Sequence, residues 1–417
     1  MIKIVEAKNF SRDEISIKAP DVSKTVSEII DNVRLNGDKA VIEYEAKFDG
    51  VKLSSLEVSN EEINEALKKV GNDYVSMLER AAENIREFHS KQVRNGFAFS
   101  RQNGAILGQR VIPLERVGLY VPGGTASYPS SVLMDAIPAK IAGCDEIYIA
   151  TPPEIKNEII SAAHVAGVNK IFKMGGAQAV AALAYGTESV KKVDKIVGPG
   201  NVYVAEAKRQ VFGRVAIDMI AGPSEILIIA DENNNPAYLA ADMLAQSEHD
   251  KLASAILLTN SRELAERVSS EIEAQIVKLI RHDIARVSVD NQGRIILVDE
   301  LDEAVKIANE IAPEHLEICT ANPFLMLTKI RNAGSVFLGS YTPEALGDYF
   351  AGPNHTLPTM GTARFSSPLS VDDFIKKSQY IYYTPEALNE ASRDIENFAN
   401  SEGLTGHANS VVIRRGK

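Results

Sequence analysis

Short apolar runs of β-forming residues alternate with helix-like stretches in the middle of the chain, and this alternation restricts the fold more than any other feature. The runs are residues 117–120, 146–150, 170–173 and 195–197. The helix-like stretches after them are residues 130–142, 154–166, 177–185 and 202–212. Strands that are apolar throughout and joined through helices are typical of a parallel sheet with helices on both faces. The middle of the chain is therefore predicted to be an α/β domain.

Loops rich in glycine follow three of these predicted strands, at residues 122–125, 175–178 and 198–201. Ligands of open α/β sheets bind at the carboxyl ends of strands, where glycine lets the backbone approach a ligand and a helix start offers N–H donors to an anion. The G-x-G-x-x-G fingerprint is absent, since Tyr203 stands where its third glycine would be, and no P-loop occurs. A nucleotide or phosphate site is predicted here, and purely structural turns are the open alternative.

The remaining chain predicts a second α/β region with helical and irregular flanks. Its length of 417 residues already favours two or more domains, because single cores rarely exceed about 250–300 residues. Strands are expected at residues 225–230, 253–259, 294–298, 316–320, 335–338 and 410–414. Helices are expected at residues 236–249, 261–280, 301–311 and 384–398, with further helices between 20 and 102. Residues 341–362, rich in Gly, Pro and Thr, are expected to form an irregular loop.

The predicted helix over residues 236–249 carries the first candidate metal ligands. Asn235 suits the N-cap and Pro236 the first turn, where a missing N–H costs nothing. Gln246 and His249 lie one turn apart, so an amide oxygen and an imidazole nitrogen could bind one ion. A polar helix end with a solvated histidine is the alternative.

Further candidates for chemistry fall in the second half of the chain. Pro313 ends a helix, so Glu314 and His315 are expected in the turn before a strand, where acid and base side chains are more often functional than within a helix. Asp348, His355 and His407 also stand beside acids, amides or glycines. Imidazoles with an oxygen donor suit a metal, and a separate base near neutral pKa suits hydrolysis or redox chemistry. A metalloenzyme is the leading interpretation, although no H-E-x-x-H motif supports it.

Composition excludes several classes of function. The net charge of −11 without a basic stripe argues against nucleic-acid binding. No apolar run approaches the roughly 18 residues of a membrane span, and the amino terminus lacks a signal pattern. Two cysteines, Cys144 and Cys319, lie in apolar segments and are expected to be core residues in a reducing compartment. A cytoplasmic protein is predicted.

Motifs spread along residues 115–414 strongly resemble the histidinol dehydrogenase family, and they occur in family order. They are VGLYVPGG at 117–124, GPGN at 198–201, AGPSE at 221–225, AQSEH at 245–249, APEHL at 312–316, GDY at 347–349, NHTLPT at 354–359 and LTGH at 404–407. The resemblance implies two Rossmann-like domains, incomplete and doubly wound, with mainly parallel sheets and small N- and C-terminal extensions that exchange in a dimer. The expected division is an arm at 1–20, a substrate and metal domain at 21–114 and 226–368, an inserted NAD domain at 115–225, and a dimerisation tail at 369–417.

The resemblance also implies residue roles. It implies one zinc ion per subunit, NAD as cofactor, and L-histidinol entering the metal shell through its imidazole and amino nitrogens. The implied metal ligands are Gln246, His249, Asp348 and His407. These four and His315 also contact the substrate, with Ser224, His355 and Glu402, while Glu314 and His315 form the acid–base pair. The implied NAD contacts are Tyr120, Gln178 and Asn201.

The implied reaction oxidises histidinol to the aldehyde, hydrates it and oxidises the hydrate to histidine, with one NAD reduced in each oxidation. The resemblance also implies a homodimer in which the tail that carries Glu402 and His407 crosses to the partner, so that each site is shared. Two other functions remain open, a metal-dependent hydrolase in which Glu314 activates water and a non-catalytic metal- or solute-binding protein. Manganese is an open alternative to zinc, since glutamine is an unusual zinc ligand.

Overall fold

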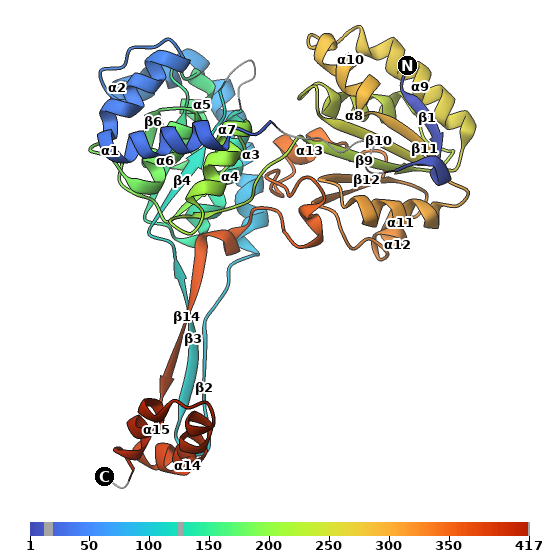
Figure 1. The fold of residues 1–417 in the computed structure, drawn as a ribbon. Helices are drawn as coiled ribbons and strands as arrows, with labels where there is room; N and C mark the ends of the chain where they lie inside the picture. Colours follow the sequence, from blue (N-terminus) through green and yellow to red (C-terminus); the bar gives the residue numbers. More distant parts are fainter. Residues whose placement is uncertain (12–19, 124–127, 416–417) are drawn as a thin grey trace. The chain divides into compact units, whose positions relative to one another are not determined.

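The computed structural model describes residues 1–11, 20–123 and 128–415. They form two compact units, which Figure 1 colours along the chain. The first unit comprises Met1–Gln92 and Glu115–Phe374, and the second comprises Val93–Leu114 and Ile375–Lys417. The first unit contains two parallel sheets with their helices, so the predicted α/β class with mainly parallel sheets is confirmed.

A five-stranded sheet of the first unit has the strand order β6-β5-β4-β7-β8, and all its pairs are parallel. Its strands are β4 (Arg116–Tyr120), β5 (Glu146–Thr151), β6 (Lys170–Lys173), β7 (Lys195–Val197) and β8 (Ala216–Ile217). The crossover helices are α4 (Pro129–Ala142), α5 (Asn157–Ala166), α6 (Gly176–Tyr185) and α7 (Val202–Val211). The alternation in the sequence therefore predicted the strands β4 to β7 and these helices to within a few residues.

Three amino-terminal helices cover this five-stranded sheet. They are α1 (Ser23–Phe48), α2 (Asn60–Val70) and α3 (Asn72–Ser90). Helix α1 packs against α6 and α7, and its Val26 and Ile30 share a core with Phe172 of β6. The expected division grouped residues 21–114 with residues 226–368, whereas these helices pack with the other sheet. An amphipathic pattern reveals that a helix has an apolar face but not which sheet that face covers.

The second sheet of this unit has six parallel strands in the order β1-β11-β10-β9-β12-β13. They are β1 (Lys3–Glu6), β9 (Glu225–Ala230), β10 (Ser254–Thr259), β11 (Arg294–Leu297), β12 (His315–Cys319) and β13 (Ser335–Leu338). Its helices include α8 (Pro236–Ser247), α9 (Arg262–Ile276), α10 (His282–Asn291), α11 (Leu301–Ile311) and α12 (Pro323–Leu327). Part of the amino-terminal arm expected at 1–20 belongs to this sheet, because β1 forms its edge beside β11. Residues 12–19 of the expected arm lie outside the described residues.

Three expectations for secondary structure differ from the structure, one in its end and two in the type of element. The helix expected over 261–280 ends at Ile276, and α10 then begins at His282. The expected loop over 341–362 contains a short helix, α13 (Glu344–Tyr349), which the surrounding Gly and Pro residues obscured. Residues 410–414 are not a strand, because α15 (Thr405–Val412) occupies this region and packs on α14. Tertiary contacts here outweigh the β propensity of Val411, Val412 and Ile413.

The second unit combines an antiparallel sheet with two helices. The strand order is β14-β3-β2, with β2 (Phe97–Ser100), β3 (Ile106–Pro113) and β14 (Ile375–Tyr382), followed by α14 (Pro385–Ser401) and α15. Residues 97–113 therefore pair with the carboxyl-terminal segment, whereas the expected division placed them with residues 226–368. Across the described residues of both units, no helix is long and apolar enough to cross a membrane, and Cys144 and Cys319 are buried free thiols.

Glu45 of α1 is a buried carboxyl group inside the first unit. Its Oε1 accepts hydrogen bonds from the backbone N–H of Gly175 and from Nε2 of Gln178, both at 3.0 Å. Burial raises the pKa of Glu45 to about 8. Folding therefore favours the protonated carboxyl, and unfolding in the neutral range releases a proton.

We predict that Glu45→Gln removes a pH dependence of stability. The stability from a raised carboxyl pKa is present below the pKa of the unfolded chain and is lost as the pH rises towards about 8. Between about pH 5.5 and about pH 7.5 the variant should gain stability relative to the parent protein, by up to about 1.4 kcal/mol per pH unit. Urea unfolding at several pH values measures this, with Glu43→Gln, an exposed change on α1, as the control. If the free energy of unfolding changed with pH by the same amount in Glu45→Gln and in the parent protein, the prediction would be contradicted.

Candidate functional site

His315 is the first residue of β12 and lies at the amino ends of neighbouring strands of the six-stranded sheet. It is 4% exposed, and its Nδ1 lies 3.1 Å from the carbonyl oxygen of Glu225, the first residue of β9. A carbonyl oxygen only accepts, so this contact is a hydrogen bond when Nδ1 carries a proton. Nε2 is buried without a hydrogen-bond partner among the described residues. His315 was expected in a turn before the strand, but pairing with β9 extends the strand to include it.

Three carboxylates surround the imidazole of His315. Its ring nitrogens lie 3.7 Å from Oε2 of Glu314, 3.8 Å from Oε1 of Glu344 and 3.7 Å from Oδ1 of Asp348. Burial alone would lower the pKa of His315, but Glu344, Glu314 and Asp348 together raise it well above its usual value. Burial also raises the pKa of Glu314 to about 8, although its Oε2 accepts a hydrogen bond from the Glu225 backbone N–H at 2.9 Å. A divalent cation beside these acids would offset their charge.

Gln246 and His249 lie at the carboxyl end of α8, as predicted. Asn235 caps this helix by accepting a hydrogen bond from the Ala237 N–H, and Pro236 is its first residue. The Gln246 side chain is fully buried, with Nε2 3.3 Å from His315 Nδ1 and Oε1 unpartnered within the described structure. His249 stands two residues beyond the helix end. Burial lowers its pKa, which favours the neutral imidazole that a metal ion requires.

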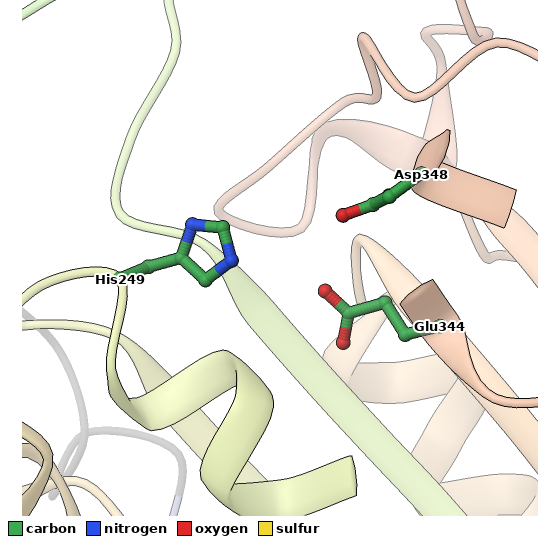
Figure 2. A group of neighbouring side chains, drawn as sticks. All are labelled: His249, Glu344 and Asp348. Atoms are coloured by element: carbon green, nitrogen blue, oxygen red, sulfur yellow. The ribbon is translucent and has the colours of Figure 1, made fainter. Parts of the chain in front are cut away.

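The side chains of His249, Glu344 and Asp348 converge, as Figure 2 shows, and their ligand atoms all lie within 4.8 Å of one another. Asp348 and Glu344 are four residues apart on α13 and therefore share one helix face. Glu344 was missed from the sequence, since its spacing from Asp348 matters only if this segment is helical. An imidazole with carboxylate and amide oxygens suits zinc or manganese, and the unpartnered oxygens of Gln246 and Glu344 fit that role.

A cavity of about 110 Å³ adjoins this cluster and has His315, Asp348 and His355 in its lining. His355 Nδ1 lies 3.0 Å from the Asp348 carbonyl oxygen, and its Nε2 lies 3.1 Å from Oγ of Ser131. The cavity is therefore lined by the predicted base His315, the predicted metal ligand Asp348 and the predicted substrate contact His355.

Ser224, another predicted substrate contact, directly precedes β9. Its carbonyl oxygen accepts a hydrogen bond from the Ser254 N–H.

Two other predicted site residues belong to the second unit. Glu402 is the C-cap residue of α14 and His407 is in α15, and both are exposed. Their predicted contacts with metal and substrate therefore stay a proposal.

The predicted NAD contacts lie at the carboxyl ends of strands in the five-stranded sheet. Tyr120 ends β4, and its hydroxyl accepts a hydrogen bond from the Gly176 N–H at 3.1 Å. Gln178 is in the first turn of α6, and Asn201 caps α7 by accepting from two backbone N–H groups. Helix starts of this kind can bind a phosphate group. In the loop over 122–125, Gly124 and Thr125 lie outside the described residues.

Gly198, in the loop after β7, requires glycine. Its φ is +106°, and a Cβ there would collide with the Tyr120 carbonyl oxygen. This glycine is therefore required by a close contact between two backbone segments, and the predicted approach of these loops to a ligand stays a prediction. Glu45, which binds Gln178 and the Gly175 N–H, was missed, because a glutamate within an amphipathic helix gives no signal of its distant partners.

Two parallel sheets with crossover helices, with the predicted acid–base pair beside donors that could hold a metal ion, are typical of an α/β enzyme. The family model for histidinol dehydrogenase matches residues 12–415. The chain is 58% identical over 398 residues to histidinol dehydrogenase of Clostridium acetobutylicum, covering 94% of this chain and 92% of the relative. It is 54% identical over 406 residues to that of Bacillus cereus, covering 97% and 95%.

A solved structure agrees with the sequence relatives. The crystal structure of histidinol dehydrogenase from Elizabethkingia anophelis matches with a TM-score of 0.93 at 38% identity, covering 99% of this chain and 98% of that chain. The chain belongs to the histidinol dehydrogenase family and is an oxidoreductase.

Proposed function

We propose that the chain oxidises L-histidinol through L-histidinal to L-histidine with reduction of two NAD, in the last steps of histidine biosynthesis in the cytoplasm. The observation that supports this proposal best is the position of His315, whose Nε2 faces Asp348 and whose Nδ1 lies near Glu314. The family model for histidinol dehydrogenase covers residues 12–415, which include all three residues. One zinc ion per subunit is proposed, and its ligands are Gln246, His249, Asp348 and His407. Substrate contacts are these residues with Ser224, His315, His355 and Glu402, and NAD contacts are Tyr120, Gln178 and Asn201.

His315 acts as the base in both oxidations. Removing a hydride from an alcohol requires a proton to leave the hydroxyl, and Nε2 is available for it while Nδ1 stays bonded to the Glu225 carbonyl. Glu344, Glu314 and Asp348 raise the pKa of His315, and a divalent cation bound beside them would offset their charge and leave Nε2 able to accept the proton. The same nitrogen can take the proton of the aldehyde hydrate in the second oxidation.

Glu314 activates water for the hydration between the two oxidations. The Glu225 N–H holds one of its oxygens, which orients the carboxyl group, and burial places its pKa at about 8, within reach of cellular pH. When bound, the metal orients the amino alcohol through its nitrogens and NAD accepts the hydride. A hydrolase would use Glu314 in the same manner, but the dehydrogenase relatives do not favour it.

We further propose a homodimer in which the carboxyl-terminal tail completes the partner's site. Large apolar side chains are exposed on the second unit, and contact with a second copy would remove apolar surface from water. They are Phe97 (58% exposed), Ile381 (74%), Phe398 (71%) and Ile413 (56%). The proposed partners are thus a second copy of the chain and histidinol, with no nucleic acid and no membrane.

The proposed reaction predicts two NADH for each histidinol consumed, because two oxidations occur at one site. Absorbance at the NADH band, with histidinol limiting, measures the yield. Chelator treatment should abolish NADH formation and zinc should restore it. A yield of one NADH with accumulating aldehyde would contradict the proposal, and hydrolysis without NADH would favour the hydrolase.

The roles of Glu314 and His315 predict separable defects. Glu314→Gln should slow oxidation of added histidinal far more than oxidation of histidinol to the aldehyde, because only the aldehyde needs water. His315→Asn should slow both steps, by about 10²–10⁴-fold. Single-turnover rates with each substrate measure this, and equal damage to both steps by Glu314→Gln would sink the assignment.

The shared site predicts complementation between two inactive variants. His315→Ala and His407→Ala chains are refolded together in equal amounts, and each is also refolded alone as a control. If the tail crosses, each mixed dimer has one site with both defects and one with neither, so random pairing restores about a quarter of parent activity. If the tail stays on its own chain, every site keeps a defect. Verified mixed dimers without activity would rule out the shared site.

A further inference from the structure

The carboxyl group of Glu344 lies beside the position that a metal ion bound to His249 and Asp348 would take. The ligand atoms of the three residues are all within 4.8 Å of one another, and Figure 2 shows the three side chains pointing toward one space. Donor atoms at about 2.0–2.2 Å from a tetrahedral zinc ion are about 3.3–3.6 Å apart. Side-chain shifts of up to about 1 Å would therefore bring all three donors onto one ion.

Within the part of the chain that the structure describes, one oxygen of the Glu344 carboxyl group has no hydrogen-bond partner. The residue is 3% exposed, and this oxygen is its Oε2. Its Oε1 is 3.8 Å from His315 Nδ1, which already contacts the Glu225 carbonyl at 3.1 Å. A buried carboxylate without a partner is costly, and coordination of a cation would supply the missing interaction.

The backbone at Glu344 is held in place independently of any metal. Its N–H donates a hydrogen bond of 2.9 Å to Oε1 of Glu317 in β12. This contact fixes the first residue of α13 against β12. The side chain therefore points toward His249 and Asp348 from an anchored position.

We propose that Glu344 is a further metal ligand, which coordinates the ion with His249 and Asp348 before substrate binds. This inference rests on the proposed function, because it assumes a metal at these two residues. The proposed substrate offers two nitrogens to the same ion. Glu344 occupies a coordination position that one of these nitrogens takes over, and its carboxyl group is then left beside His315.

Zinc affinity without catalysis tests the inference. The full-length protein is stripped of metal and titrated with zinc against a chromophoric chelator, without NAD, in the absence and presence of histidinol. Glu344→Gln should weaken zinc binding at least about tenfold without histidinol, and the difference should narrow with histidinol present. Asp242→Asn is the matched control, because it removes a carboxylate from the same acidic cluster but not from the converging three. It should change zinc affinity by less than about threefold.

Each outcome decides between the alternatives. The inference is overturned if Glu344→Gln binds zinc within about threefold of the parent protein in the absence of histidinol. It is also overturned if the loss of zinc affinity in Glu344→Gln is no larger than the loss in Asp242→Asn. If circular dichroism shows that Glu344→Gln is unfolded, Glu344→Asp replaces it, since it keeps the charge but shortens the reach. Undiminished affinity in Glu344→Asp would show that charge alone matters and would overturn the inference. His249→Ala is the reference, because zinc affinity unchanged in that variant contradicts the proposed metal site itself.

Discussion

The contact between the His315 imidazole and the Glu225 carbonyl is the interaction on which the candidate site depends. The parallel pairing of β9 with β12 sets it, because the register places His315 beside Ile226. The contact is a hydrogen bond when Nδ1 carries a proton, and Nε2 then lies toward Asp348, 3.7 Å from its Oδ1. Glu314, the residue before it, accepts a hydrogen bond from the N–H of the same Glu225. One pair of strands therefore orients both members of the proposed acid–base pair.

Burial of the acids in and next to the candidate site costs folding free energy. Glu314, Glu344 and Glu317 are each less than 10% exposed, at 6%, 3% and 1%, and burial raises the pKa of all three. Such a cluster repels itself and contributes little to stability. Clusters of perturbed carboxyl groups of this kind are found mainly at functional sites. A metal ion, the imidazolium form of His315 and the substrate ammonium group are charges that would offset the cluster.

The candidate site residues lie at opposite ends of the strands in the two sheets. In the five-stranded sheet the glycine loops, Tyr120 and Asn201 lie at the carboxyl ends of strands, as expected for a nucleotide site. In the six-stranded sheet Glu225 and His315 begin their strands. A general rule for α/β sheets predicted the first arrangement. The second depends on α8 and α13, which bring Gln246 and Asp348 to the amino ends of β9 and β12.

The sequence by itself determined the strands β4 to β7, their crossover helices and the capped start of α8, because these depend on local periodicity and on Asn235 and Pro236. It also supplied the family motifs. Only the tertiary structure decided that α1 covers the five-stranded sheet, that Glu45 binds Gln178 and that Glu344 faces His249. Each of these depends on segments far apart in the chain, and their packing is not encoded in local pattern. The α-helical state of α13 and α15 was likewise decided by tertiary contacts that outweigh local propensity.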